Sequence, residues 1–217
     1  AREIAFTDTD LVVFAEGDRP SDLPPRFAWV SGDPTRESQL PKARISFASA
    51  VIVVGSRTET PQNADARTLL TLFTIRRFMK GHERTEHRKE PLYIAAEILD
   101  DENVEHARTA GADEVIETRR LGFSLLAHAV TQPGTATIMG AVASAGANSL
   151  YVGAVPPAIP LPSTFGAVAG AVRISHGVLV LGLRGADGSN IINPPDPAVV
   201  APGELLLYLA ESAVLPD

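Results

Sequence analysis

The chain has 217 residues, of which 45% are hydrophobic, and a formal net charge of −7. This composition can bury a sizeable core, arranged as one large domain or two small ones. The acidic balance argues against a nucleic-acid partner, because phosphate backbones are bound by concentrated basic surfaces. The sequence contains no cysteine, which excludes disulfides and thiolate metal sites and favours the cytosol over a secreted location.

Residues 11 to 120 alternate short apolar runs with helix-like segments, the pattern typical of a parallel α/β sheet. Strands are predicted at Leu11–Ala15, Phe27–Val30, Ala50–Val54, Leu92–Leu99 and Glu114–Ile116. Helices are predicted over 63–79 and 100–110, and a third from about Leu121 to Val130, before Pro133. The fold class expected for this part of the chain is therefore α/β.

A segment of unusual composition runs from Leu121 to Val172 and contains no Asp, Glu, Lys or Arg. Prolines interrupt it, and small residues dominate over large apolar ones, so it offers no unbroken span of about 20 strongly apolar residues to cross a membrane. We therefore expect no membrane span here. We interpret the segment as a helix packed against another subunit, with an ordinary interior helix and loop as the alternative.

The character of the sequence changes after this segment. Gly177–Leu183 and Glu204–Leu209 are predicted strands of a small β-rich lobe. The predicted organisation is therefore a sheet-containing lobe over residues 1–130, a crossover segment over 131–151 and a C-terminal lobe over 152–217.

No motif of a known enzyme class accompanies the predicted sheet. The sequence lacks a Gly-x-Ser-x-Gly nucleophile elbow, a Walker phosphate loop and a His-Glu-x-x-His zinc pair. We therefore expect that the protein is not an enzyme and has no catalytic residues.

Asp33 is the first candidate for a binding residue. It follows a predicted strand directly, and ligands of open α/β sheets bind beyond the carboxyl ends of the strands. An acid there accepts hydrogen bonds from adenosine in dinucleotide-binding folds, so Asp33 is a candidate nucleotide contact. The alternative is structural, because Asp33 is a good N-cap and Pro34 suits the first position of a helix.

Glu97 is the second candidate, because it lies in the apolar run from Leu92 to Leu99. A carboxylate in such a run is costly unless it is paired or bound to a metal. Glu97 is therefore a candidate metal ligand. An ordinary acid at the end of a strand, hydrogen-bonded to neighbouring amides, is the alternative.

Several short segments occur in an order and spacing that are typical of one known family. They are Phe27–Thr35, Leu40–Ile45, Ala50–Val54, Tyr93–Glu97, Glu102–Asn103 and Ala110–Val115, followed downstream by Gly177–Gly182, Ile191–Pro195 and Pro202–Leu207. The first six resemble the N-terminal lobe, and the last three the C-terminal lobe, of RCK (regulator of potassium conductance) domains. The resemblance covers about residues 10 to 210 and is carried by the combination of segments.

This resemblance implies a Rossmann-like N-terminal lobe, a helical crossover that dimerises and a small α+β C-terminal lobe. Family members form gating rings beneath potassium pores and bind divalent cations such as calcium, adenine nucleotides, NAD(H) or cyclic dinucleotides. We therefore expect a ligand-sensing domain at the cytoplasmic face of the cell membrane, with its own copies and a potassium pore domain or membrane subunit as partners. The alternatives are a peripheral regulatory subunit of a potassium uptake transporter and an NAD-dependent oxidoreductase.

The sequence departs from the RCK pattern in two respects. The first βα unit with its Gly-rich phosphate turn is missing, and Ala1–Ala5 resembles the end of the helix that follows this turn, so a fragment of a longer chain is expected. In calcium-gated members, acids occupy three positions that align with Val54, Glu97 and Leu99. Only Glu97 is acidic here, so the resemblance implies weak calcium binding.

Overall fold

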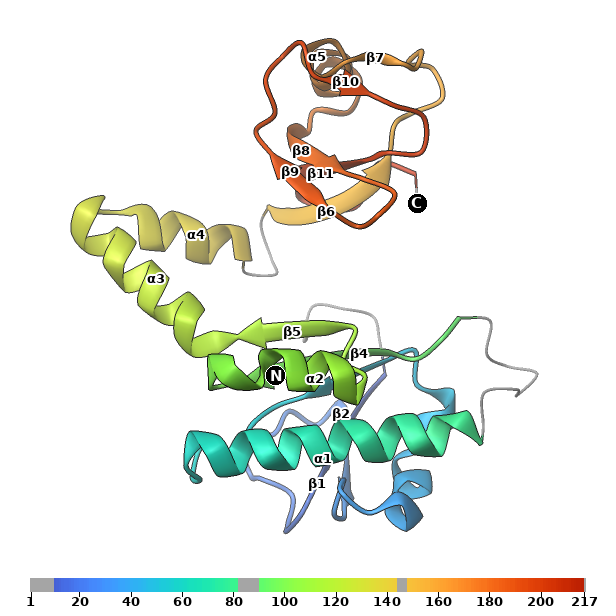
Figure 1. The fold of residues 1–217 in the computed structure, drawn as a ribbon, viewed down its shortest axis with the longest axis vertical. Helices are drawn as coiled ribbons and strands as arrows, with labels where there is room; N and C mark the ends of the chain where they lie inside the picture. The colour runs from blue at the N-terminus through green and yellow to red at the C-terminus, as the bar shows by residue number, and fades with distance from the viewer. Residues whose placement is uncertain (1–9, 82–89, 144–147, 217) are drawn as a thin grey trace. The chain divides into compact units, whose positions relative to one another are not determined.

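The computed structural model describes residues 10–81, 90–143 and 148–216, which form two compact units (Figure 1). We call residues 10–127 the N-terminal unit and residues 128–216 the C-terminal unit. The division falls within helix α3 (Thr118–Thr131). The domain boundaries that we placed after residues 130 and 151 stay predictions.

The N-terminal unit is an α/β lobe with two parallel sheets. β1 (Leu11–Ala15) pairs with β2 (Phe27–Ser31), whereas β3 (Ala50–Val53), β4 (Tyr93–Ile98) and β5 (Glu114–Glu117) form a three-stranded sheet. Within the described ranges no backbone pairing joins β1 to β3. All five strands lie where they were predicted, which confirms the α/β class, while Ala1–Ala5 lies outside the described residues.

The connections of this unit are helical. They comprise the 3₁₀ helices η2 (Glu37–Ala43), η3 (Ile45–Phe47) and η4 (Asp101–Asn103) and the α-helices α1 (Pro61–Lys80) and α2 (Val104–Ala110), followed by α3. The start of α1 is well defined, because the Thr60 hydroxyl accepts the N–H of Asn63 at 3.4 Å and Pro61 occupies the first turn. The first turns of α1 lie beside the end of β4, because Asp65 of α1 accepts the N–H groups of Leu99 and Asp100.

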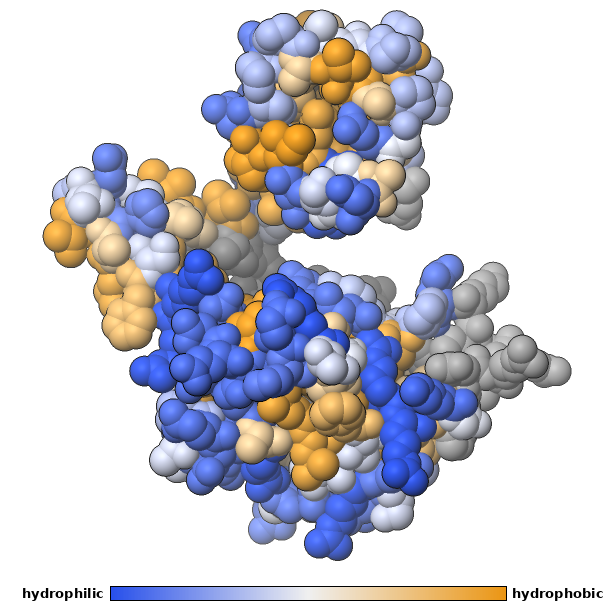
Figure 2. Space-filling view, viewed as in Figure 1, coloured by the Kyte–Doolittle hydropathy of each residue, from blue (hydrophilic) through white to orange (hydrophobic). Residues whose placement is uncertain are grey.

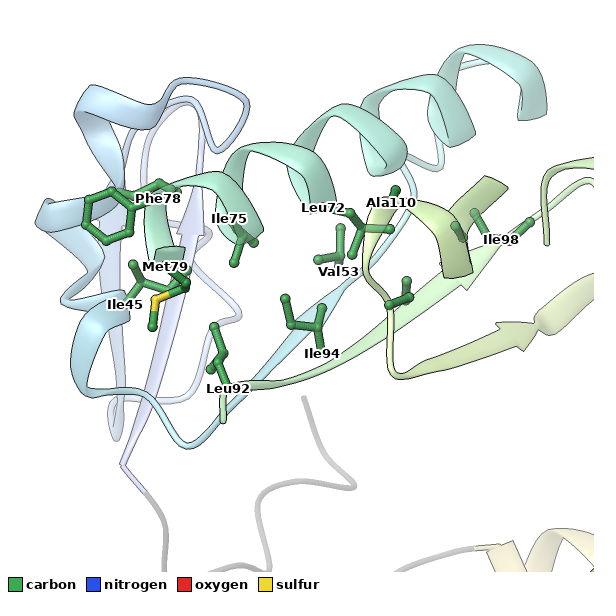
Figure 3. Packing of buried hydrophobic residues seen from close by; sticks show 14 residues of the cluster. Ile45, Val53, Leu72, Ile75, Phe78, Met79, Leu92, Ile94, Ile98 and Ala110 are labelled. Carbon is green, nitrogen blue, oxygen red and sulfur yellow. The ribbon is translucent and has the colours of Figure 1, made fainter. Parts of the chain in front are cut away.

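One face of α1 covers the three-stranded sheet (Figure 3). Leu72, Ile75 and Met79 recur at helical spacing and are buried together with Ile94 and Ile98 of β4. Burial of each such side chain contributes roughly 1.5–3 kcal/mol. This core makes the sheet a firm support for the residues at its carboxyl edge.

Arg76 of α1 fixes the opposite, amino edge of the sheet. Its guanidinium donates to the carbonyls of Leu92 and Gly111, both at 2.7 Å, and to the carboxylate of Asp113 at 2.6 Å. Gly111 ends α2 with φ of +106°, and a Cβ there would lie 2.5 Å from Cγ of Arg76. Only glycine suits this position, because both its conformation and the packed arginine exclude a side chain.

The C-terminal unit is a small α+β lobe. It contains α4 (Thr135–Ala143), β6 (Ser149–Ala154), β7 (Ser163–Thr164), α5 (Phe165–His176), β8 (Leu179–Arg184), β9 (Asn190–Ile192), β10 (Val199–Val200) and β11 (Leu205–Ala210). The main sheet is antiparallel in the order β6-β11-β8-β9, and Val168 and Val172 of α5 are buried in one core with Leu206 and Tyr208 of β11. The two strands predicted for this lobe correspond to β8 and β11, whereas β6, β9 and α5 were not predicted.

The uncharged segment from Leu121 to Val172 divides into two parts. Its last part supplies the internal core of the C-terminal unit through Phe165, Val168 and Val172, so there the alternative of an ordinary interior helix applies. Its first part, α3, contains no buried residue. Among the described residues, no helix combines the length and the apolar character that crossing a membrane requires.

Candidate functional site at the carboxyl edge of the sheet

Asp33 follows β2 and is held in a tight turn. Its carboxylate accepts the N–H of Thr35 at 2.9 Å, the hydroxyl of Thr35 at 2.6 Å and Nε of Arg36 at 3.1 Å. The alternative that Asp33 begins a helix is wrong, because η2 begins at Glu37 and Arg36 is at its N-cap. The short polar side chain stabilises a turn instead. A nucleotide contact by Asp33 stays a prediction.

The hydrogen bond from the Thr35 hydroxyl lowers the pKa of Asp33 below its ordinary value, despite an opposing contribution from burial. A carboxylate with a lowered pKa stabilises the folded state when it is ionised, and this contribution is lost as the pH falls through the pKa of the folded state. Asp33→Asn should therefore reduce the free energy of unfolding at pH 7 by about 1 kcal/mol. Urea unfolding at successively lower pH should show the difference between the two proteins shrinking, and a difference that does not change with pH would contradict the ionised role.

Glu97 lies on β4, and only 5% of its surface is exposed. Both of its carboxylate oxygens nevertheless accept hydrogen bonds from the protein. Its Oε2 accepts the N–H of Gly55 at 3.1 Å. Its Oε1 accepts Nη2 of Arg57 at 2.8 Å and the hydroxyl of Thr118 at 2.7 Å. These partners come from the loop after β3 and from the first residue of α3, so Glu97 connects three elements. A buried carboxylate is tolerated here because it is paired and hydrogen-bonded.

Asp65 is a second buried carboxylate at this edge, and its partners could not be predicted from the sequence. It projects from α1, is fully buried and accepts the N–H groups of Leu99 and Asp100 at 2.9 and 3.0 Å and Nδ2 of Asn103 at 3.0 Å. It therefore fixes the path of the chain as β4 ends. A signal was present in the sequence, since Asp65 shares the buried face of α1 with Leu72 at i+7 spacing.

A shallow hollow opens beside these carboxylates, where β4 and β5 end and α3 begins. Its lining includes acids, namely Asp100, Asp101 and Glu117, and the basic or aromatic residues Arg119, Arg120 and Phe123. Both signs of charge are present in this lining, beside the apolar side chains of Ile98, Leu99 and Phe123. Across the residues that the structure describes, no group of three or more His, Asp or Glu side chains is arranged to hold a metal ion.

The positions aligned with the acids of calcium-gated relatives lie together at this edge. A Cβ at Gly55 would lie 3.5 Å from Cδ1 of Leu99 and 3.7 Å from Oε2 of Glu97, so these two side chains flank the same backbone segment. Val54, which precedes Gly55, is 66% exposed. The structure thus brings Glu97 and Leu99 together, but only Glu97 offers oxygen ligands. The role of Glu97 as a metal ligand stays a prediction.

Comparison with known proteins bears on the family. Residues 18–116 match the family described as the calcium-activated potassium channel slowpoke-like RCK domain. This match confirms the resemblance found in the sequence. Asp33, Asp65 and Glu97 all lie within the matched residues.

Proteins similar to this chain include a potassium channel and a gating ring. The calcium-gated potassium channel TvoK of Thermoplasma volcanium is 31% identical over 127 residues, which are 57% of this chain and 34% of TvoK. The structure of the human SLO3 gating ring matches 93% of this chain and 39% of that chain, with a TM-score of 0.69 and 14% identity. The structure of the GsuK channel bound to NAD covers 95% of this chain and 37% of that chain, with a TM-score of 0.43 and 20% identity. The chain thus spans between a third and two fifths of the length of these proteins.

Proposed function

We propose that this chain is a cytosolic ligand-sensing domain of a gating ring that regulates a potassium channel. The observation that carries the proposal is the match of residues 18–116 to the RCK domain of calcium-activated potassium channels. The 31% identity to the potassium channel TvoK supports the same class of function. As a domain of this kind, the chain acts by binding rather than by turnover, and it lies at the inner face of the cell membrane.

The fold provides the parts that such a function needs. The carboxyl edge of the sheet carries the buried acids and the polar hollow of a sensing site, and α3 starts at this edge and leads into the C-terminal unit. A ligand that prefers one arrangement of this edge would shift the population of α3 positions and so act on an attached pore. The partners are further copies of the chain and a potassium pore domain or membrane subunit.

The residues at this edge bear on the ligand of the sensing site. TvoK is calcium-gated, but calcium prefers six to eight oxygen ligands, and here the carboxylate of Glu97 is already engaged while Val54 and Leu99 supply none. The residues present therefore do not fit a calcium ion of that kind. An adenine nucleotide at the end of β2, in contact with Asp33, is the other ligand that we predict.

Two experiments test the proposed function. Rubidium flux should be measured through vesicles that contain TvoK with its matching segment replaced by this chain, in the presence and absence of adenine nucleotides and calcium. Flux that is retained and responds to a ligand would support regulation of a pore. Light scattering on the purified chain should show a dimer or larger assembly, and a stable monomer at micromolar concentration would contradict a gating-ring domain.

The alternative functions predict different results in these experiments. A peripheral subunit of an uptake transporter would assemble in the same way but leave flux through the TvoK chimera without regulation. An oxidoreductase would consume NAD(H) with a substrate. Turnover of NAD(H) would favour an oxidoreductase over a gating-ring domain.

A further inference from the structure

Glu97 is the point at which the carboxyl edge of the sheet holds the start of α3. Its carboxylate accepts the hydroxyl of Thr118, the first residue of α3, at 2.7 Å and the N–H of Gly55, from the loop after β3, at 3.1 Å. These two hydrogen bonds therefore fix the position of the start of α3 relative to the sheet.

A carboxylate with 5% exposure needs a positive charge to be stable in its ionised form. In the described part of the chain, its ion-pair partner is the guanidinium of Arg57, at 2.8 Å from Oε1. The side chain of Arg57 is 70% exposed, so it reaches from the loop after β3 to cover the carboxylate from the solvent side. A cation that took the place of this guanidinium would occupy the same side of Glu97, because Gly55 is buried and Thr118 holds Oε1 from α3.

We propose that Arg57 is a resident cation of this site, which neutralises Glu97 and holds the start of α3 without a metal ion. The guanidinium is always charged and cannot dissociate from the protein, so the anchor of α3 is present at all cation concentrations. The Glu97 carboxylate is consequently insensitive to calcium, and a regulatory ligand acts at another point of the same edge, in the adjoining hollow or at the end of β2. The consequence for regulation rests on the proposed function. The ion pair that holds the start of α3 is a property of the folded chain and does not depend on that function.

Hydrogen exchange over residues 118–126 tests the anchor directly. Arg57→Ala should raise the exchange rate of this stretch at least about tenfold, because the start of α3 loses the neutralised carboxylate that holds it. Arg57→Lys should restore most of the protection, since it returns the positive charge. Arg108→Ala removes an equally charged residue whose ion pair with Glu105 is exposed on α2, and it should leave the stretch unchanged.

Two outcomes would overturn the proposal. The first is an exchange rate of residues 118–126 in Arg57→Ala that equals the rate in the unmodified chain. Equal exchange rates in Arg57→Ala and Arg57→Lys would overturn it in the same way. The second is a calcium-dependent change in exchange or in melting temperature of the unmodified chain that Glu97→Gln abolishes. Thr118→Val checks the other half of the anchor, because it should raise exchange in the same stretch while the ion pair stays intact.

A further variant separates this inference from the proposed function. Introducing Val54→Asp and Leu99→Glu should create a calcium response only when Arg57→Ala is also present, because the guanidinium otherwise competes with the metal. An equal calcium response with Arg57 retained would contradict its role as a resident cation. These measurements concern the purified chain alone, so a failure of the flux experiment would leave their outcome unaffected.

Discussion

Asp65→Ala should lower the free energy of unfolding of the N-terminal unit by at least about 3 kcal/mol. The fully buried carboxylate accepts hydrogen bonds from the backbone of Leu99 and Asp100 and from the side chain of Asn103. Its removal leaves these three partly buried donors without their acceptor, and a donor without a partner costs about 1–3 kcal/mol where water cannot replace it. Urea unfolding followed by the fluorescence of Trp29, the one tryptophan of the chain, reports on this unit.

Two control variants sharpen this measurement. Asp101→Ala removes a neighbouring acid that is exposed, and it should change stability by no more than about 0.5 kcal/mol. Asp65→Asn keeps the size of the side chain but replaces one acceptor oxygen with an NH2 group, which cannot accept a hydrogen bond from these donors. Asp65→Asn should therefore also lower the free energy of unfolding. A stability for Asp65→Ala close to that of Asp101→Ala would show that the buried carboxylate does not hold the end of β4.

Leu126→Asp should convert the assembled protein into a monomer by raising the dissociation constant at least about a hundredfold. Phe123, Leu126 and Val130 follow one another at helical spacing on α3 and are 65%, 63% and 83% exposed. Figure 2 shows apolar residues gathered over the region of α3 and α4. We expect this stripe to be covered by a second copy of the chain, where an introduced carboxylate would be buried without a partner.

Ser124→Asp is the matched control for the assembly measurement. Ser124 lies on the side of α3 that also carries Arg120 and His128, roughly opposite Leu126, so an acid there should leave association unchanged. Sedimentation velocity over a series of concentrations gives the dissociation constants. Equal dissociation constants for the two aspartate variants would place the interface between copies away from the apolar stripe.

The sequence predicts the fold well where hydrophobic periodicity is strong. The strands of the N-terminal unit are short β-branched runs between turn residues, and α1 has an apolar face with a defined start, so both were placed correctly. The helix α5 was missed because its first eight residues are mostly Ala, Gly and Val and belong to the uncharged segment. The composition of this segment did not distinguish a helix that is buried within its own lobe from a helix that packs against another subunit.

The candidate site was predicted in part, because residue type and chain position are visible in a sequence but partners are not. Glu97 was identified from its unexpected charge within an apolar strand. Its contacts with Arg57 and Thr118 join residues 40 and 21 positions away, and such pairings depend on how the elements pack. The contacts of Asp65 could not be predicted for the same reason, since its three donors lie 34 to 38 positions along the chain.

The division of the parallel strands into two sheets leaves β1 and β3 each with one edge that no strand in the described ranges covers. Val12 and Ile52 on these strands are 47% and 57% exposed. An uncovered edge with apolar side chains is a template on which a strand of another molecule can grow. Concentrated samples of this chain are therefore expected to form β-rich aggregates through these edges, and thioflavin fluorescence would distinguish such growth from the helical association that Leu126→Asp abolishes.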